Sequence, residues 1–301
     1  MDWRDILKVR LRASRVRFDH PLRGATTLRI GGPAECLVDV EGEDDLAALL
    51  GLVAERELPL FILGKGSNVL IPDDGLRGVV MRLGRTFSEV ERLGESNRVV
   101  AGAGQPNPRF LEACRRWGLG GMEFLTAIPG TIGGAIAMNA GAHDGETARY
   151  LRVVRFHEHP GGIRNEPAES FRFGYRESPL RGQLGRIVLA GQFELTPLGE
   201  AEIRARIELF QEFRRRTQPR DFPNSGSVFK NPPGEHAARL IDAAGLKGAR
   251  RGGAQVSDKH ANFIVNRGGA TAADVVGLVD LVRQRVYQQT GIDLELEIQV
   301  L

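Results

Sequence analysis

The stretch IPGTIGGAIAMNAGA, residues 128–142, is built almost entirely of small side chains. Residues this small make a poor core and a poor exposed helix, but they let main chain lie against a flat or extended ligand. A buried packing seam is the alternative interpretation. Because Pro-Gly-Thr and Asn-Ala-Gly near its two ends are polar turn sequences, we expect a ligand-binding loop.

Two shorter glycine turns precede this stretch, and each follows a predicted strand. GKGSNVL (64–70) follows a strand expected at 60–63, and GAG (102–104) follows one expected at 98–101. Main-chain N–H groups in such turns can point at a phosphate, since glycine lacks Cβ and accepts positive φ. An ordinary tight turn is the alternative for the first, which matches neither a P-loop nor GxGxxG. Three glycine turns within about 80 residues predict one long ligand with two phosphates, held mostly by main chain.

The composition is that of a folded protein with an excess of glycine. The 301 residues include 38 glycines and 42% hydrophobic side chains, so global disorder is excluded and two domains, or three small ones, are expected. A net charge of +3 with scattered positive charges is no nucleic-acid signature. Two distant cysteines and scattered histidines indicate a reducing compartment and no metal cluster. With neither an apolar spanning run nor a signal peptide, we expect a cytoplasmic protein with no membrane partner.

The chain alternates strand-like and helix-like segments up to an amphipathic helix near residue 200, where we place a domain boundary. A compact α+β unit of about 100 residues follows. The expected strands are 34–40, 60–63, 78–83, 98–101, 151–156, 187–195, 227–230, 261–265 and 294–301. The expected helices are 43–55, 108–117, 200–216, 235–244 and 271–289.

Two further segments carry residue types that bind anions. FGYRES places Arg176 beside Tyr175, which offers a forked cation to a carboxylate or phosphate, although a surface arginine is favoured for this segment alone. PNSGSVFKNP brings a hydroxyl, a cation and an amide together in Ser227, Lys230 and Asn231. A plain turn-strand-turn is the alternative there, and without GxSxG a serine hydrolase is not expected.

The last residues, LELEIQV, alternate strictly between apolar and polar side chains. A strand would therefore place Glu295, Glu297 and Gln299 on one face. That face is usually turned to solvent, and a catalytic glutamate is the less common alternative.

Together these segments resemble the UDP-N-acetylenolpyruvoylglucosamine reductase family, the flavoenzymes that complete UDP-N-acetylmuramate for bacterial peptidoglycan. The similarity covers most of residues 20–301, and the motifs occur in the family's order. The motifs are TLRIGGPA (27–34), GKGSNVL (64–70), IPGTIGGA (128–135), MNAGA (138–142), FxYRxS (173–178), GSVFKNP (226–232) and LxLEI (294–298).

The resemblance implies an α+β fold of three parts. Residues 1–82 would form the first subdomain of an FAD-binding domain of the vanillyl-alcohol-oxidase type, together with an N-terminal extension. Residues 83–199 would form the second subdomain, and residues 200–301 a smaller substrate-binding domain. One class of the family carries an extra tyrosine-bearing loop over the substrate. This chain is compact after Arg176 and has three tyrosines, so it resembles the class that lacks the loop.

The resemblance also implies the site. The catalytic residues would be Arg176, Ser227 and Glu297. Substrate contacts would come from Tyr175, Lys230, Asn231 and His260. The residues implied to bind noncovalent FAD are Arg29, Gly64, Lys65, Gly66, Ser67, Asn68, Gly102, Gly104, Pro129, Gly130, Thr131, Gly133, Gly134, Asn139 and Gly141.

The implied reaction is reduction of the enolpyruvyl C=C bond of UDP-N-acetylglucosamine-enolpyruvate, with NADPH as the electron donor and no metal. Reduction builds enolate-like charge on the substrate carboxylate, which Arg176 and a protonated Glu297 would stabilise. Ser227 would then protonate the α-carbon, with Lys230 or a water relay assisting. We expect a monomer whose product serves cell-wall synthesis, and with it cell shape and division.

Two alternatives remain open from the residues. An FAD-linked oxidase of small alcohols or hydroxy acids would share the fold but need a different C-terminal domain. A non-catalytic UDP-sugar or flavin-binding protein would have no need of Ser227 or Glu297.

Overall fold

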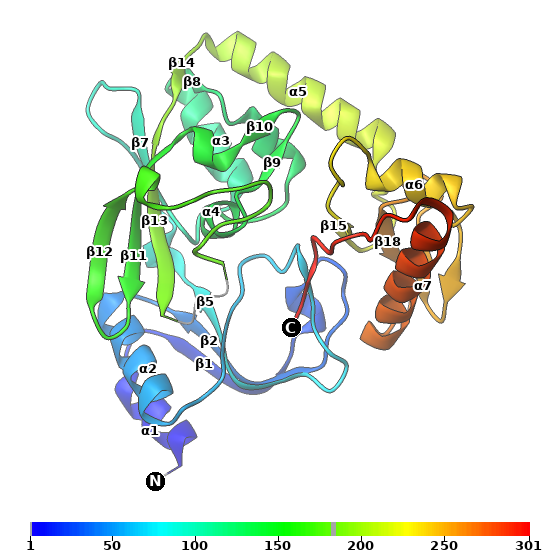
Figure 1. Cartoon of the computed structure of the whole chain (residues 1–301). Coiled ribbons are helices and arrows are strands. Elements are labelled where there is room, and N and C mark those ends of the chain that lie inside the picture. Colours follow the sequence, from blue (N-terminus) through cyan, green and yellow to red (C-terminus); the bar gives the residue numbers. More distant parts are fainter. Residues whose placement is uncertain (1, 182–184) are drawn as a thin grey trace. The chain divides into compact units, whose positions relative to one another are not determined.

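The computed structural model describes residues 2–181 and 185–301 and has a mixed α/β architecture (Figure 1). By their contacts the residues form two units, each assembled from separate stretches of chain. The first unit comprises Met1–Phe18, Cys36–Gly64 and Gly78–Glu212, and the second comprises Asp19–Glu35, Lys65–Arg77 and Phe213–Leu301. The expected α+β fold class is confirmed. The predicted three-part division at 82/83 and 199/200 stays a prediction.

A four-stranded sheet in the order β1-β2-β5-β3 has strands that cross between the units. Its strands are β1 (Arg15–Pro21), β2 (Pro33–Val40), β5 (Leu76–Leu83) and β3 (Leu60–Ile62). In the first unit, α1 (Trp3–Arg10) and α2 (Glu43–Glu55) contact each other and share an apolar core with this sheet. Leu7, Val38, Leu46 and Val79 of that core are fully buried. The helix predicted at 43–55 is confirmed, and three acidic residues in its first turn suit a helix N-terminus.

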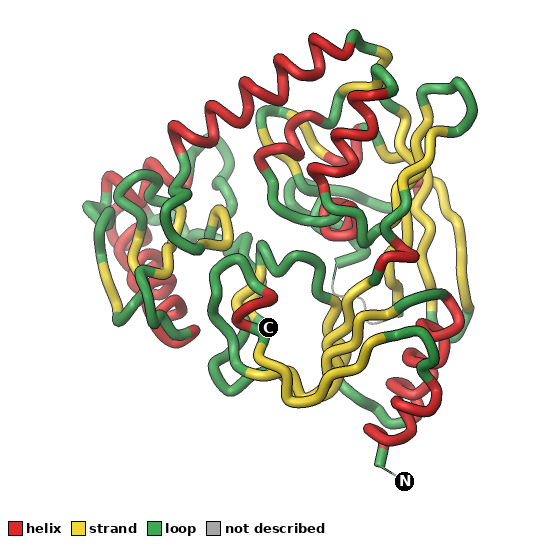
Figure 2. Tube along the Cα trace, turned by 180° about the vertical axis from the view of Figure 1, so that it is seen from behind, coloured by secondary structure: helices red, strands yellow, loops and turns green. Residues whose placement is uncertain are grey.

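The rest of the first unit is an antiparallel sheet in the order β12-β11-β13-β7-β6, whose strands lie side by side in Figure 2. Its strands are β6 (Val90–Arg92), β7 (Arg98–Gly102), β11 (Leu151–Glu158), β12 (Gly162–Pro167) and β13 (Arg186–Glu194). α3 (Asn107–Arg116) and α4 (Ile132–Ala137) share its core, where the rings of Phe110 and Phe193 are 5.4 Å apart. The shorter elements of this unit are η2 (Arg85–Phe87), β8 (Leu119–Gly120), η3 (Glu123–Ala127), β9 (Gly141–Ala142), β10 (Gly145–Glu146), η4 (Thr147–Arg149), η5 (Ala168–Ser170) and β14 (Thr196–Pro197).

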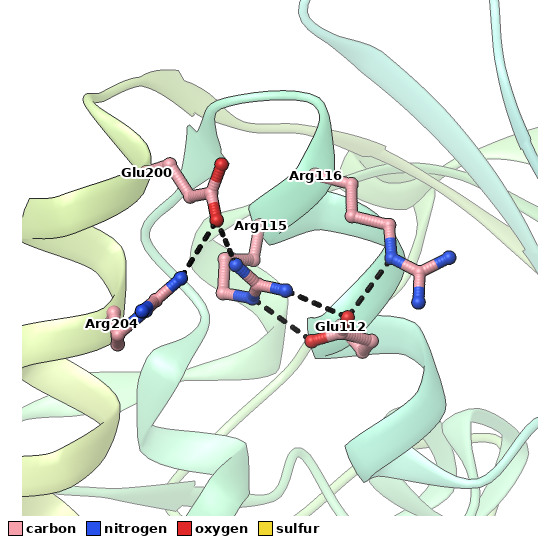
Figure 3. A network of polar contacts seen from close by, with 5 residues as sticks. All are labelled: Glu112, Arg115, Arg116, Glu200 and Arg204. Carbon is pink, nitrogen blue, oxygen red and sulfur yellow. Dashed lines mark hydrogen bonds and ion pairs between the residues drawn. The ribbon is translucent and has the colours of Figure 1, made fainter.

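Helix α5 (Glu200–Thr217) begins in the first unit and carries the chain into the second. Its first turn is joined to α3 by the ion-pair network of Figure 3, in which Arg115 contacts both Glu112 and Glu200. Arg204 also binds Glu200, and Arg116 binds Glu112. Hydrogen bonds from Arg115 lower the pKa of the Glu112 carboxyl to about 2. The start of α5 is therefore anchored on α3 by charged side chains.

The second unit contains an antiparallel sheet in the order β15-β18-β17-β16. Its strands are β15 (Asn224–Ser227), β18 (Phe263–Asn266), β17 (Ala254–Val256) and β16 (Arg250–Arg251). The helices are α6 (Ala237–Ala243) and α7 (Ala272–Thr290), the short helix is η1 (Arg23–Ala25), and a separate parallel pair joins β4 (Val69–Leu70) to β19 (Gln299–Val300). The core of this unit includes Leu28, Ile30 and Leu70 as well as residues after 227.

Three local expectations need correction. The small-residue stretch does contain a helix, α4, because Thr131 caps it while Ile132 and Ile136 are fully buried in the core. The strand expected at 227–230 lies at Asn224–Ser227 instead, and Phe229 forms an isolated bridge with Leu296. The strand expected at 294–301 is regular only at β19. No helix in the described part of the chain is long and apolar enough to cross a membrane.

Candidate active site

Two of the predicted glycine turns lie side by side in the first unit. The N–H of Ile132 donates to the C=O of Gln105 at 2.9 Å, and the N–H of Gly133 donates to the C=O of Ala103 at 2.8 Å. A Cβ added to Gly133 would lie 2.8 Å from the Cβ of Ala103, so a larger residue does not fit there. The turn after β7 and the turn before α4 are thus hydrogen-bonded to each other, as binding of one ligand by both turns would require.

The third glycine turn reaches the same place at Gly64. A Cβ on Gly64 would come within 3.0 Å of Oγ1 of Thr131, the side chain that caps α4 by accepting from the N–H of Gly134 at 3.4 Å. Gly64 and Gly134 are exposed although their neighbours Leu63 and Thr131 are buried. Exposed main chain without side chains is what a flat, diphosphate-bearing group needs for close approach. These residues therefore fit FAD.

Five other predicted cofactor residues, Arg29 and residues 65–68, lie in the second unit. Gly66 is buried with φ +60, and its C=O accepts from the N–H of Thr27 at 3.0 Å. A Cβ on Gly66 would lie 2.8 Å from the Cα of Thr26, which explains the glycine sterically. Lys65 and Arg29 are exposed and free of this packing constraint. Their assignment to FAD stays a prediction.

Asn139 is 1% exposed, and its side chain is used within the protein. Its amide donates to the C=O of Gly174 at 2.8 Å and to Oε2 of Glu146 at 3.1 Å, and its Oδ1 accepts from the N–H of Ala148 at 2.9 Å. The residue therefore fastens the small-residue stretch to the segment that carries Arg176. Whether it also contacts FAD stays a prediction.

Arg176 lies in a tight turn and reaches back to the small-residue stretch. Main-chain hydrogen bonds of 3.0 and 3.1 Å between Gly174 and Glu177 close the turn, and Arg176 adopts a φ of 57°. Its guanidinium donates to the C=O of Gly141 and lies 4.9 Å from the ring centroid of Tyr175. A positive φ is uncommon for arginine, so the backbone of this turn is in a specific conformation. The hydrogen bond to Gly141 then holds the guanidinium in place.

Ser227 and Glu297 lie on neighbouring segments of the second unit. The N–H of Glu297 donates to the C=O of Val228 at 2.8 Å, and the N–H of Ile298 donates to the same oxygen at 3.3 Å. Val228 directly follows Ser227, and both Ser227 and Glu297 are half-buried. A hydroxyl and a carboxyl thus come from adjacent backbone positions, whereas Arg176 belongs to the first unit.

The predicted substrate residues of the second unit differ in their surroundings. Lys230 is 5% exposed and pairs with Glu295, while the Oδ1 of Asn231 accepts from the N–H of Ala237 at the start of α6. His260 packs edge-on against Phe263, and its Nδ1 is buried without a partner among the described residues. Burial lowers the pKa of His260, so its neutral form is favoured. A neutral imidazole with an unused ring nitrogen can hydrogen-bond a ligand.

Two contacts near the site were not expected from the sequence. The side-chain amide of Asn68 donates to the C=O of Glu297 at 3.0 Å. Asp73, in the loop after β4, accepts from the N–H of Ala272 at 2.8 Å and of Ala273 at 3.1 Å at the start of α7. The turn sequence Pro-Asp-Asp-Gly marks Asp73 as a loop residue, but its partner nearly 200 residues away leaves no local signal.

Comparison with known proteins gives the same picture over almost the whole chain. Residues 218–301 match the family described as "UDP-N-acetylenolpyruvoylglucosamine reductase, C-terminal domain", and residues 34–162 match "FAD binding domain". A UDP-N-acetylenolpyruvoylglucosamine reductase of Geobacter metallireducens is 45% identical and covers 98% of both chains. Another, from Symbiobacterium thermophilum, is 44% identical and covers 95% of this chain and 92% of the relative.

Solved structures agree with these sequence matches. The crystal structure of UDP-N-acetylenolpyruvylglucosamine reductase from Thermus caldophilus superposes with a TM-score of 0.80 at 38% identity, covering 95% of this chain and 98% of that one. An alkyldihydroxyacetonephosphate synthase, 16% identical with a TM-score of 0.51 over 65% of this chain, shares the fold alone. With glycine turns that fit FAD and relatives matched from end to end, the chain belongs to the UDP-N-acetylenolpyruvoylglucosamine reductase family.

Proposed function

We propose that Arg176, Ser227 and Glu297 carry out the reaction of this family in this chain. The protein is an FAD-dependent oxidoreductase that reduces UDP-N-acetylglucosamine-enolpyruvate to UDP-N-acetylmuramate with NADPH, in peptidoglycan synthesis. The observation that carries the residue assignment is the hydrogen bond from the N–H of Glu297 to the C=O of Val228. This main-chain bond joins Glu297 to the residue that follows Ser227, which supports the assignment.

The three side chains have separate tasks. When bound, FAD supplies the electrons that NADPH provides. Reduction at the carbon β to the substrate carboxylate moves negative charge onto that carboxylate. Arg176, whose guanidinium donates to the C=O of Gly141, supplies fixed positive charge, and a protonated Glu297 donates a hydrogen bond or proton to the same group.

Ser227 completes the reaction by giving its proton to the α-carbon. A hydroxyl is a weak acid, but the enolate-like species is strongly basic, so this transfer can run downhill. The alkoxide left on Ser227 needs stabilisation. Lys230 lies three residues further along the same segment and is the cation suited to that task, directly or through water.

The purified protein tests this function by its colour. It should be yellow, lose the colour anaerobically with NADPH, and regain it on addition of UDP-N-acetylglucosamine-enolpyruvate. Rapid recovery of colour with oxygen, and none with this substrate, would favour an oxidase. Failure of NADPH to bleach it would favour a non-catalytic binding protein.

The proposal extends to a cytoplasmic monomer with the three parts 1–82, 83–199 and 200–301. Cys36 and Cys114 are buried free thiols, which suits a reducing compartment. Light scattering should give a mass near 33.0 kDa. Twice that mass would contradict the monomer.

A further inference from the structure

Residues 65–70 and the C-terminal segment are joined within the second unit. β4 pairs in parallel with β19. The N–H of Gln299 donates to the C=O of Asn68 at 3.0 Å, and the N–H of Leu301 donates to the C=O of Leu70 at 3.1 Å. The turn expected to hold FAD is therefore also the strand partner of the segment that carries the proposed acid.

The peptide groups on both sides of the Glu297 Cα are held by hydrogen bonds. Its C=O accepts from Nδ2 of Asn68 at 3.0 Å, and its N–H donates to the C=O of Val228 at 2.8 Å. Val228 is 1% exposed and belongs to the core of the unit. Because both peptide groups of Glu297 are fixed, the direction of its Cα–Cβ bond is fixed as well.

Of these two contacts, the one from Asn68 is made by a side chain and can be removed by mutation. The main-chain bond from Gln299 to Asn68 does not depend on the asparagine side chain. Substitution of Asn68 should therefore release the Glu297 carbonyl while leaving the pairing of β4 with β19 in place.

We propose that Asn68 is a positioning residue for Glu297: its amide holds the main chain of Glu297 and thereby sets the direction in which the side chain leaves the backbone toward the substrate. The inference rests on the proposed role of Glu297. It gives Asn68 a task separate from the FAD contact expected of the glycine turn. Through Asn68, the cofactor turn and the acid share one hydrogen-bonded frame.

The test uses the holoenzyme with Asn68→Ala and Asn68→Asp, the second of which keeps the size and loses the donor. Reoxidation of the reduced enzyme by UDP-N-acetylglucosamine-enolpyruvate should slow about three- to tenfold, the value of one hydrogen bond. The KM for this substrate and the rate of flavin reduction by NADPH should stay within twofold. The dissociation constant of FAD, measured by titrating apoprotein into fluorescent FAD, should change by a smaller factor than the rate of reoxidation, because the Asn68 side chain is only one of the contacts expected to hold FAD.

Asn97→Ala is the matched control, because its amide donates to the C=O of Leu195 at 2.9 Å in the first unit. It should leave both half-reactions unchanged. The decisive comparison places Asn68→Ala in a Glu297→Ala background, where an asparagine acting through the Glu297 side chain should cause less than twofold further loss.

Three results would overturn the inference: a full loss in that background, a loss of FAD affinity equal to the loss in rate, or no effect of Asn68→Ala while Glu297→Ala is slow. Glu297→Ala at the wild-type rate would instead contradict the proposed function itself.

Discussion

The ammonium of Lys230 lies 2.6 Å from Oε1 of Glu295, and the two side chains differ greatly in exposure, 6% for the lysine and 68% for the glutamate. The N–H of Lys230 also donates to the C=O of Glu295 at 2.8 Å. A buried cation thus reaches an exposed carboxylate across two neighbouring segments. Because desolvation of the lysine is costly without a partner, the exposed residue supports the buried one.

Glu295→Gln should lower the free energy of unfolding by about 1–2 kcal/mol, because a charged partner of a buried ammonium is lost. Urea denaturation followed by circular dichroism measures this change. Glu202→Gln is the matched control, since Glu202 pairs with the exposed Arg206 in α5 and should change stability by less than about 0.5 kcal/mol. Equal effects of the two substitutions would contradict the supporting role of Glu295.

Ser227→Ala should abolish turnover of the enolpyruvyl substrate, because the α-carbon loses its proton donor. The loss should reach several powers of ten, at about 1.4 kcal/mol for each. Reduction of the flavin by NADPH requires no carbon protonation and should proceed at the wild-type rate. Stopped-flow absorbance separates the half-reactions, and slow flavin reduction would show that Ser227 has a broader role.

Arg176→Lys should slow the substrate half-reaction at least about tenfold although the charge is kept. A single ammonium cannot both bind the Gly141 carbonyl and present a fork to the substrate carboxylate. Arg172→Lys, at an exposed position nearby, should leave both half-reactions unchanged. A variant at position 176 that slowed only flavin reduction by NADPH would place the arginine elsewhere in the mechanism.

Acidification should destabilise the first unit through His157, which is 5% exposed and whose Nδ1 has no partner among the described residues. Burial lowers the pKa of His157, the charge of His159 lowers it further, and Glu43 opposes the change. The unfolded chain, with a histidine pKa near 6.5, then binds the proton more readily than the folded protein. Stability should therefore fall as the pH drops below about 6.5, by at most about 1.4 kcal/mol per pH unit.

His157→Asn should reduce this pH dependence in urea unfolding measured between about pH 8 and pH 5. An unchanged slope in the variant would assign the effect to other groups.

The FAD should be noncovalent. His143 is the histidine closest in sequence to the small-residue stretch, and its ring stacks on Phe210 with centroids 4.3 Å apart and planes 10° apart. An imidazole held this way is a packing group rather than an attachment point. Acid precipitation should release all of the flavin into the supernatant, and a yellow pellet would contradict this expectation.

Elements with strong local signals could be predicted from the sequence. Helix α7 was expected at 271–289 and lies at Ala272–Thr290, because Thr271 and Asp274 form a capping box and Gly291 ends the helix with a φ of 72°. Helix α4 was missed because its composition argues against a helix. Burial of its two isoleucines in the core stabilises the helix despite that composition. Tertiary packing overrides propensity in such a short segment.

The residue types of the site could be predicted from the sequence, but the contacts between distant residues could not. The apolar alternation of the C-terminal segment was right, since Leu294 and Ile298 are buried. Its strand partner was not foreseeable, because Asn68 is 229 residues from Glu297 and no local pattern encodes such a pairing. The sequence likewise predicted that Glu295 faces solvent. Its side chain is indeed exposed, but its ion pair with Lys230 could not be predicted.

The interleaving of the two units limits how the gene can be divided. A fragment encoding only residues 213–301 would lack Leu28, Ile30 and Leu70 from its core, and Asp73 from the start of α7. It would also lack β4, the partner of β19. The second unit is therefore not encoded by one continuous stretch of the gene, and we expect residues 213–301 not to fold when expressed alone or when grafted onto another flavoprotein without residues 65–77.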